Sequence, residues 1–192
     1  YTPTSGIWQT VYLEAVGDNY LLRAHITPDV DSGLASFRLT LVDMPKSRLD
    51  AEITISFAGE VVRKLRTQVG QRMTEVAVSM IQGDLIEGFH RWSPNEPHLY
   101  DVVIRILEGD TLLDQVSTYF GMRKVAVKDG WVLLNNQPLY QRLVLDQGYW
   151  PESLLTPPSD EAIRQDLKWT KKLGYNGARK HQKVEDARYY YW

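Results

Sequence analysis

The sequence contains no cysteine, which excludes disulfide bonds and thiolate metal sites. It also has no apolar run close to the roughly 20 residues that a membrane-spanning helix needs. The formal net charge is only −2, and its basic pairs are scattered among acids. No positively charged surface is therefore expected to attract nucleic acid or an anionic membrane, and we expect neither as a partner.

Motifs for metal, phosphate or serine chemistry are also missing. No glycine-rich phosphate loop precedes the helix that we expect to begin at Ser159, and neither Ser5 nor Ser153 lies in a nucleophile elbow. The histidines show no metal-ligand spacing: His25, His90, His98 and His181. We expect no metal and no cofactor.

Aromatic residues, in contrast, are plentiful, with six Trp and eleven Tyr. Part of such a set would suit a site that stacks on sugar rings, although packing in a core is the commoner explanation. The apolar content of 43% is ordinary for a globular protein and is sufficient for a sizeable core.

Between residues 20 and 120, short runs alternate apolar and polar residues, as strands with one buried face do. Turn signals at 58–60 and 108–110 separate two pairs of these runs, and no helical period intervenes. This pattern predicts an antiparallel β-sandwich of immunoglobulin type, with a small closed barrel as the alternative. The expected strands are 20–26, 35–42, 51–57, 61–67, 74–80, 99–107 and 112–120, and strand formers also fill 7–14.

The pattern changes after residue 121. Asp129-Gly130 is a strong hairpin signal, and a strand-like run flanks it on each side. A strand–helix–strand pattern follows, which implies a parallel sheet. The expected strands are 124–128, 131–134, 139–145 and 175–178.

The helix between the last two strands has clear end signals. Ser159 is the expected N-cap, acids fill the first turn, lysines fill the last turn, and Gly174 ends the helix. The expected buried stripe consists of Ile163, Leu167 and Leu173, with Trp169 or Thr170 between them.

Polar residues follow two of the predicted parallel strands. Asp146-Gln147 comes after the first, and Arg179-Lys180-His181-Gln182 comes after the second. Ligands bind at the carboxyl ends of parallel strands, so both groups are expected to face one pocket and to hydrogen-bond hydroxyls. A solvated basic loop is the alternative. We expect Glu185, Asp186 and Arg188 to cap or brace the next helix.

The segment from Trp92 to Tyr100 contains a tempting Asn95-Glu96 pair, because a carboxylic acid beside an amide suits glycosidase chemistry. It lies within the predicted sandwich, however, and it lacks a second, facing carboxylate. We interpret the segment as a proline-bounded turn that packs Trp92 and Tyr100.

Several of these segments together resemble glycoside hydrolase family 2. Ser5-Gly6-Ile7-Trp8 resembles the end of the family's jelly-roll domain, and residues 92–100 resemble its sandwich signature, W-x-P-x-x-P-x-L-Y. Residues 120–125 are similar to its F-G-x-R segment, and 134–138 are similar to its L-N-G-x-P turn, with Asn136 for the usual Gly. The family's D-(x)-K-x-x-G-(F/Y)-N-x-x-R pattern matches Asp166, Lys172, Gly174, Tyr175, Asn176 and Arg179.

The resemblance implies a retaining exo-glycosidase of the β-galactosidase, β-glucuronidase or β-mannosidase kind, acting on a β-glycoside. It implies that 1–15 are the last strand of a preceding jelly-roll domain, 16–122 an immunoglobulin-like sandwich, and 123–192 the start of a (β/α)8 barrel. The two catalytic glutamates of such an enzyme, about 5–5.5 Å apart, lie on later barrel strands and match nothing here. This internal fragment is therefore expected to be inactive alone.

By the same resemblance, Arg179 and His181 correspond to an arginine and a histidine that line the sugar pocket. Asp146 takes the place of a residue that is commonly Arg, Asn or Asp, and Gln182 is a further pocket candidate. The family more often has Arg-x-x-His than the Arg-Lys-His found here. The substrate stays undecided at this stage, and a homo-oligomer through the sandwich or the exposed barrel edge is a further expectation. The alternative function is a non-catalytic carbohydrate-binding or scaffolding module.

Overall fold

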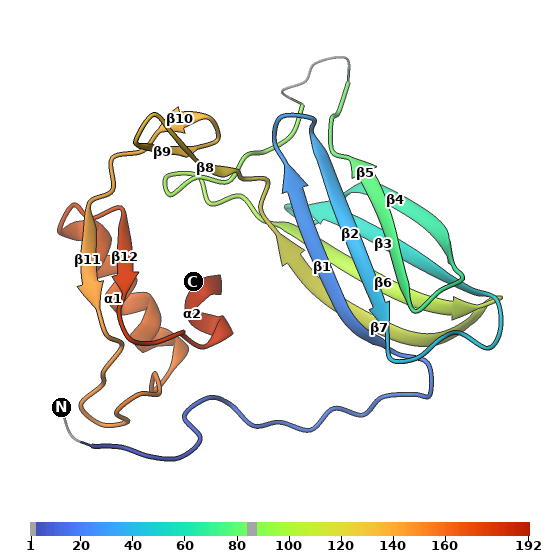
Figure 1. The fold of residues 1–192 in the computed structure, drawn as a ribbon, viewed down its shortest axis with the longest axis horizontal. Helices are drawn as coiled ribbons and strands as arrows, with labels where there is room; N and C mark the ends of the chain where they lie inside the picture. The colour runs from blue at the N-terminus through green and yellow to red at the C-terminus, as the bar shows by residue number, and fades with distance from the viewer. Residues whose placement is uncertain (1–2, 84–87) are drawn as a thin grey trace. The chain divides into compact units, whose positions relative to one another are not determined.

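The computed structural model describes residues 3–83 and 88–192, which form two compact units (Figure 1). The sandwich unit is Ala15–Leu139, and the αβ unit combines Tyr1–Glu14 with Tyr140–Trp192. The described residues are mainly β, as expected, and no helix among them is long and apolar enough to cross a membrane.

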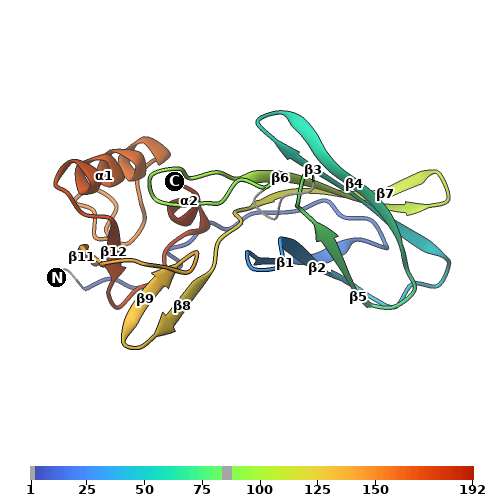
Figure 2. The ribbon, with the colours of Figure 1, turned by 90° about the horizontal axis from the view of Figure 1, so that it is seen from above.

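Within the sandwich unit, residues 21–120 form two antiparallel sheets, which Figure 2 shows as separate layers. One sheet has the strand order β1-β2-β5, and the other has the order β4-β3-β6-β7. All seven predicted strands between 20 and 120 are present, with ends shifted by a few residues. They are β1 (Leu21–Asp29), β2 (Leu34–Leu41), β3 (Leu49–Phe57), β4 (Glu60–Val69), β5 (Met73–Ser79), β6 (Tyr100–Glu108) and β7 (Thr111–Phe120).

One hydrophobic core joins the two sheets, because alternate residues of the central strands are buried. Phe37 of β2 and Phe120 of β7 meet edge to face with ring centroids 6.1 Å apart, and Tyr100 stacks on Phe120 at 5.4 Å. Burying side chains of this size stabilises the unit by about 1.5–3 kcal/mol each. The sheets share no hydrogen-bonded strand pair among the described residues, so the closed-barrel alternative was wrong.

The predicted hairpin after the sandwich is confirmed. Three short strands, β8 (Val125–Lys128), β9 (Trp131–Leu134) and β10 (Gln137–Pro138), form an antiparallel sheet. Asp129 and Gly130 have positive φ angles of 50° and 79°, as a two-residue hairpin turn requires. Asn136 has a φ of 67°, a conformation that Asn tolerates better than most residues and that explains how it replaces a glycine.

The segment from Trp92 to Tyr100 forms the expected tight turn. The Ser93 Oγ accepts a hydrogen bond from the Glu96 amide at 3.0 Å, and Tyr100 is buried while Glu96 is exposed. Asn135 Nδ2 donates to the Trp92 carbonyl at 2.9 Å. The turn therefore has a packing role.

The αβ unit contains a parallel strand pair joined through a helix. Its elements are β11 (Leu143–Asp146), α1 (Asp160–Lys172), β12 (Gly177–Lys180) and α2 (Ala187–Tyr191), and β11 pairs in parallel with β12. The predicted strand over 139–145 is shorter than expected. The predicted strand over 175–178 begins two residues later, so Arg179 and Lys180 belong to the strand and not to the loop after it.

Helix α1 begins and ends where the sequence predicted. The Ser159 Oγ accepts a hydrogen bond from the Ala162 amide, and Gly174 has a φ of 86° just after the helix. Ile163 is fully buried, but Leu173 is 70% exposed, so the predicted stripe is only partly correct. The physical reason is that a two-stranded sheet is too narrow to cover the whole length of the helix.

The strand expected over 7–14 is not formed in this structure. Among the described residues, nothing pairs with this segment, and Val11, Tyr12 and Leu13 are exposed. A strand needs a hydrogen-bonding neighbour, and strand-forming side chains alone do not supply one. The segment is held instead by contacts with residues far along the chain, such as the hydrogen bond from Thr156 Oγ1 to the Trp8 carbonyl, at 2.7 Å.

Candidate functional site

The carboxyl ends of β11 and β12 bring the two predicted polar groups side by side. Asp146 is paired in register with Lys180, and the His181 amide donates to the Asp146 carbonyl at 2.9 Å. Because neighbouring residues along a strand face opposite sides of a sheet, these polar side chains divide into two groups. One group faces α1, and the other faces away from it.

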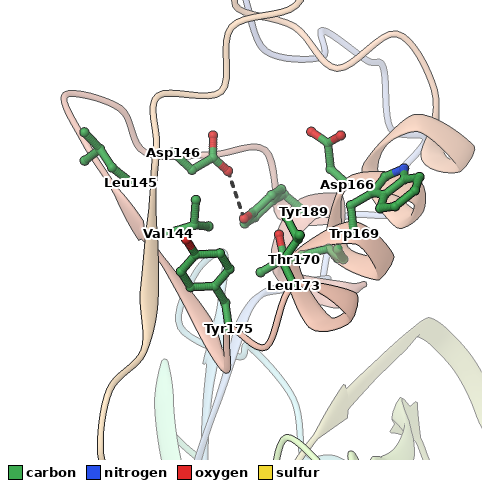
Figure 3. Close-up of a pocket in the computed structure, with 10 residues that line it drawn as sticks. Val144, Leu145, Asp146, Asp166, Trp169, Thr170, Leu173, Tyr175 and Tyr189 are labelled. Atoms are coloured by element: carbon green, nitrogen blue, oxygen red, sulfur yellow. Dashed lines mark hydrogen bonds between the residues drawn. The ribbon is translucent and has the colours of Figure 1, made fainter.

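Asp146 belongs to the group that faces the helix. Figure 3 shows its carboxylate pointing toward α1 and Tyr189, whereas Leu145 points away. A cavity of about 210 Å³, which we call the helix-side cavity, lies here. Its lining consists of Val144, Leu145, Asp146, Asp166, Leu167, Trp169, Thr170, Leu173, Tyr175 and Tyr189.

The Asp146 carboxylate is fully engaged by its own unit. Lys180 Nζ donates to Oδ2 at 2.5 Å, the Tyr189 hydroxyl donates to Oδ2 at 3.2 Å, and the Gly148 amide donates to Oδ1 at 2.7 Å. Burial pushes the pKa of Asp146 upward, but the hydrogen bonds from Lys180 and Gly148 outweigh it and leave that pKa below its usual value. Asp146 is thus a structural ion-pair partner.

The pKa values of two neighbours of Asp146 are raised instead of lowered. Burial, followed by the negative charge of Asp146, raises the pKa of the Tyr189 hydroxyl, which therefore stays protonated and donates. Burial and the same charge raise the pKa of Asp166. The helix-side cavity consequently holds one carboxylate that favours ionisation and one that resists it.

The second group surrounds another cavity of about 200 Å³, which we call the loop pocket. Gln147 Nε2 donates to His181 Nδ1 at 2.9 Å, which places the ring proton on Nε2 and makes that nitrogen a donor. Gln182 adopts a φ of 59° and is exposed at the same place. The lining consists of Thr4, Gln147, Tyr149, Leu155, His181, Gln182 and Lys183.

The structure thus brings together only part of the predicted site. His181 and Gln182 line the loop pocket with Gln147, whereas Asp146 lines the helix-side cavity, so these two cavities separate Asp146 from the other predicted residues. Arg179 lines neither cavity. It is exposed on β12, in register with Leu145 on the face turned away from α1.

Sequence reasoning missed the most buried charges of the unit. Lys183 Nζ lies 3.1 Å from Glu185 Oε1, and Lys180 Nζ lies 2.7 Å from the same oxygen. Glu185 is only 3% exposed, so it does more than brace the next helix. Asp186 does cap α2, since its side chain accepts from the Arg188 amide.

The lining of the loop pocket carries amide, imidazole, phenol, hydroxyl and ammonium groups, and it includes no carboxylate. Such a set can hydrogen-bond sugar hydroxyls, but it cannot supply the paired carboxylates of glycoside hydrolysis. Within residues 3–83 and 88–192, no group of three or more His, Asp or Glu side chains is arranged to hold a metal ion.

These features define a β-sandwich followed by a parallel strand–helix–strand unit with a polar pocket at the strand ends. Residues 19–123 match the family model described as glycosyl hydrolases family 2. The chain belongs to this family, as its motifs suggested.

Curated relatives extend the likeness beyond the sandwich. A β-galactosidase of Leuconostoc mesenteroides is 24% identical over 97% of this chain and 19% of its own length. A β-galactosidase of Lactococcus lactis has the same identity and covers 97% of this chain and 18% of its own length. A β-galactosidase of Vibrio cholerae is 35% identical over 52% of this chain and 10% of its own length. The chain therefore spans about a fifth of the length of the first two relatives.

Solved structures show the same fold. A putative β-galactosidase from Bacteroides fragilis has a TM-score of 0.75, with 18% identity over 90% of this chain and 28% of that one. The β-glucuronidase of Ruminococcus gnavus, in complex with C6-substituted uronic isofagomine, has a TM-score of 0.72, with 17% identity over 92% of this chain and 28% of that one.

Proposed function

We propose that this chain is part of a retaining exo-β-glycosidase and that the loop pocket is one wall of its sugar site. The observation that carries the proposal is the hydrogen bond from Gln147 to His181 at the carboxyl ends of two parallel strands. In α/β sheets and barrels this is where ligands bind. Membership of a glycoside hydrolase family supports the same assignment.

The proposed domain organisation follows from the strand order. Residues 16–122 form an immunoglobulin-like sandwich, since their seven strands make one antiparallel sheet of three strands and another of four. Residues 123–192 begin a (β/α)8 barrel, in which β11, α1 and β12 are the first strand–helix–strand unit. Residues 1–15 contribute a strand to a neighbouring jelly-roll domain. That domain would supply the hydrogen-bonding neighbour and the cover that the exposed strand-forming residues over 7–14 need.

The proposed substrate is a β-galactoside. The curated relatives that match over most of this chain are named β-galactosidases, whereas the likeness to a β-glucuronidase rests on the fold. Recognition would use donors and acceptors of the loop pocket. The Nε2 of His181 would donate to one hydroxyl, and Gln182 and the exposed Arg179 would complete that wall.

Two catalytic carboxylates of such an enzyme have to come from elsewhere in the protein, because no carboxylate lines the loop pocket. We therefore expect the 192-residue chain to be inactive by itself. The test measures hydrolysis of nitrophenyl β-D-galactoside, β-D-glucuronide and β-D-mannoside by the full-length protein and by this chain.

The expected result is turnover of the galactoside by the full-length protein, with retained anomeric configuration, and none by the chain. Turnover by the chain that disappears on replacing one of its glutamates would contradict the assignment. So would a full-length protein that binds galactose in calorimetry but hydrolyses no glycoside, since that result would indicate a binding module.

A further inference from the structure

A buried ion cluster lies directly behind the loop pocket, and it consists of Lys180, Lys183, Glu185 and Asp146. The side chains of Lys183 and Glu185 are 4% and 1% exposed. Two positive and two negative charges balance, as burial of charged groups requires. Lys183 also lines the loop pocket, so the cluster and the pocket share a residue.

The Lys183 ammonium connects separate walls of the pocket. Its Nζ donates to the Gly148 carbonyl at 2.8 Å and to the Leu155 carbonyl at 2.6 Å, and it lies 3.1 Å from Glu185 Oε1. The same ammonium lies 5.1 Å from the centre of the Trp8 ring. Gly148 follows Gln147, and Leu155 itself lines the pocket. One cation thus ties together the segments that carry the pocket's polar groups.

The Lys183 ammonium is already engaged within its own unit. Two of the three ammonium donors go to the carbonyl oxygens of Gly148 and Leu155, and the ion pair with Glu185 Oε1, 3.1 Å away, neutralises the charge. Its function is therefore to hold the pocket, not to contact substrate. The Glu185 carboxylate neutralises this buried ammonium, and its Oε1 also forms an ion pair with Lys180.

We propose that Glu185 and Lys183 are positioning residues for the sugar ring, which they serve by fixing Gln147 and His181 in the loop pocket. This inference rests on the proposed function, and it names residues that neither touch substrate nor supply the catalytic carboxylates. Without the Glu185 charge, the Lys183 ammonium lacks the one anionic partner that it has among residues 3–83 and 88–192, and it withdraws from the two carbonyls. The loops on both sides of the pocket then separate.

The first test uses the full-length protein with E185Q and K183M, and with E52Q as the matched control. Glu52 also has two cationic partners, Lys64 at 3.2 Å and Arg105 at 3.3 Å, but it lies in the sandwich. E185Q and K183M are expected to raise KM for nitrophenyl β-D-galactoside by about tenfold or more and to change kcat by less than about threefold. E52Q is expected to change neither value.

A merely structural role would give a different result, because loss of folded protein lowers the apparent kcat and leaves KM unchanged. That outcome, or unchanged values for both variants, would overturn the proposal. Rescue provides a further criterion: E185D retains the charge and is expected to restore KM more fully than E185Q.

The second test does not need activity. In the 192-residue chain, E185Q is expected to speed hydrogen exchange of the Gly148 and His181 amides, both of which donate to Asp146, by about tenfold. Amides of helix α1 are expected to keep their protection. Equal loss of protection throughout α1, or no change at Gly148 and His181, would contradict the proposal. If the full-length protein hydrolyses no glycoside, the proposed function fails, and this exchange result still decides whether Glu185 positions the pocket.

Discussion

Asp146 and Lys180 face each other across the parallel strands β11 and β12, and Lys180 Nζ donates to Asp146 Oδ2 at 2.5 Å. This pair joins the two strands on the side that faces the helix. On the other side, the polar residues Gln147 and His181 are left to form a pocket. The two faces of this small sheet therefore carry different groups, an ion pair on the helix side and the loop pocket on the other.

The first prediction concerns Asp146→Asn. The substitution removes the charge that Lys180 and the Gly148 amide stabilise, and we expect it to lower the unfolding free energy at pH 7 by about 1–3 kcal/mol. Because the folded-state pKa of Asp146 is lowered, its contribution is complete above its ordinary pKa of about 4 and is lost as the pH falls through the folded-state value.

Urea unfolding between pH 7 and pH 3 measures this effect, with the exposed turn residue Asp110 as the control site in D110N. The difference between D146N and the unsubstituted chain is expected to shrink toward low pH. A difference that stays constant across this range would show that the Asp146 charge contributes nothing.

The second prediction concerns Asp166→Asn, which is expected to raise the unfolding free energy at pH 7, whereas Asp146→Asn lowers it. Asp166 has a raised pKa because of partial burial and the charge of Asp146, so its ionisation costs stability at pH values above its folded-state pKa. Asp166→Asn is expected to stabilise the αβ unit at pH 7, by no more than about 0.5 kcal/mol because solvent screens this exposed side chain. The gain is expected to vanish below the ordinary pKa, and thermal unfolding at pH 7 and pH 3 would detect either result. Destabilisation at pH 7 would contradict the account.

The third prediction concerns Gly148, whose φ is +59°. A Cβ at this position would lie 2.7 Å from Lys183 Nζ and closer still to Glu185 Oε1. Gly148→Ala is therefore expected to displace the ion cluster and to destabilise the αβ unit by about 3 kcal/mol or more.

Gly130→Ala is the matched control, because Gly130 also has a positive φ, of 79°, but an added Cβ there meets nothing within 4 Å. It is expected to cost only the backbone strain, about 1 kcal/mol. Equal losses for the two variants in calorimetric unfolding would indicate that the cluster is not tightly packed around Gly148.

The fourth prediction concerns the start of helix α1. Ser159→Ala removes the acceptor for the Ala162 amide and is expected to cost about 1 kcal/mol. Ser5→Ala, at an exposed position, is the control. Unfolding monitored by far-ultraviolet circular dichroism would show the loss, and equal midpoints for the two variants would exclude a capping role.

Local signals in the sequence predicted most of the sandwich and the ends of α1. Alternation of apolar residues marks the central strands, and Asp129-Gly130 and Ser159 define a turn and a cap through interactions with near neighbours. Such signals are reliable because they depend on a few consecutive residues. The burial of Leu173 was predicted wrongly from these signals, because its exposure depends on how much sheet lies beneath the helix.

The site was predicted less completely because it depends on register. A strand that starts two residues late places Arg179 within β12, and pairing of Asp146 with Lys180 directs that carboxylate toward the helix. Lys183 could not be recognised as a structural cation either. Its acceptors, the carbonyls of Gly148 and Leu155, lie about 30 residues earlier and become visible only in the folded chain.

The most direct measurement of the central claim is KM for nitrophenyl β-D-galactoside in the full-length protein carrying His181→Ala, with His25→Ala as the control. His25 is an exposed residue of β1 in the sandwich unit. If the loop pocket is a wall of the sugar site, H181A raises KM by about tenfold or more while H25A leaves it unchanged. An H181A protein with the KM of the unsubstituted enzyme would contradict the account.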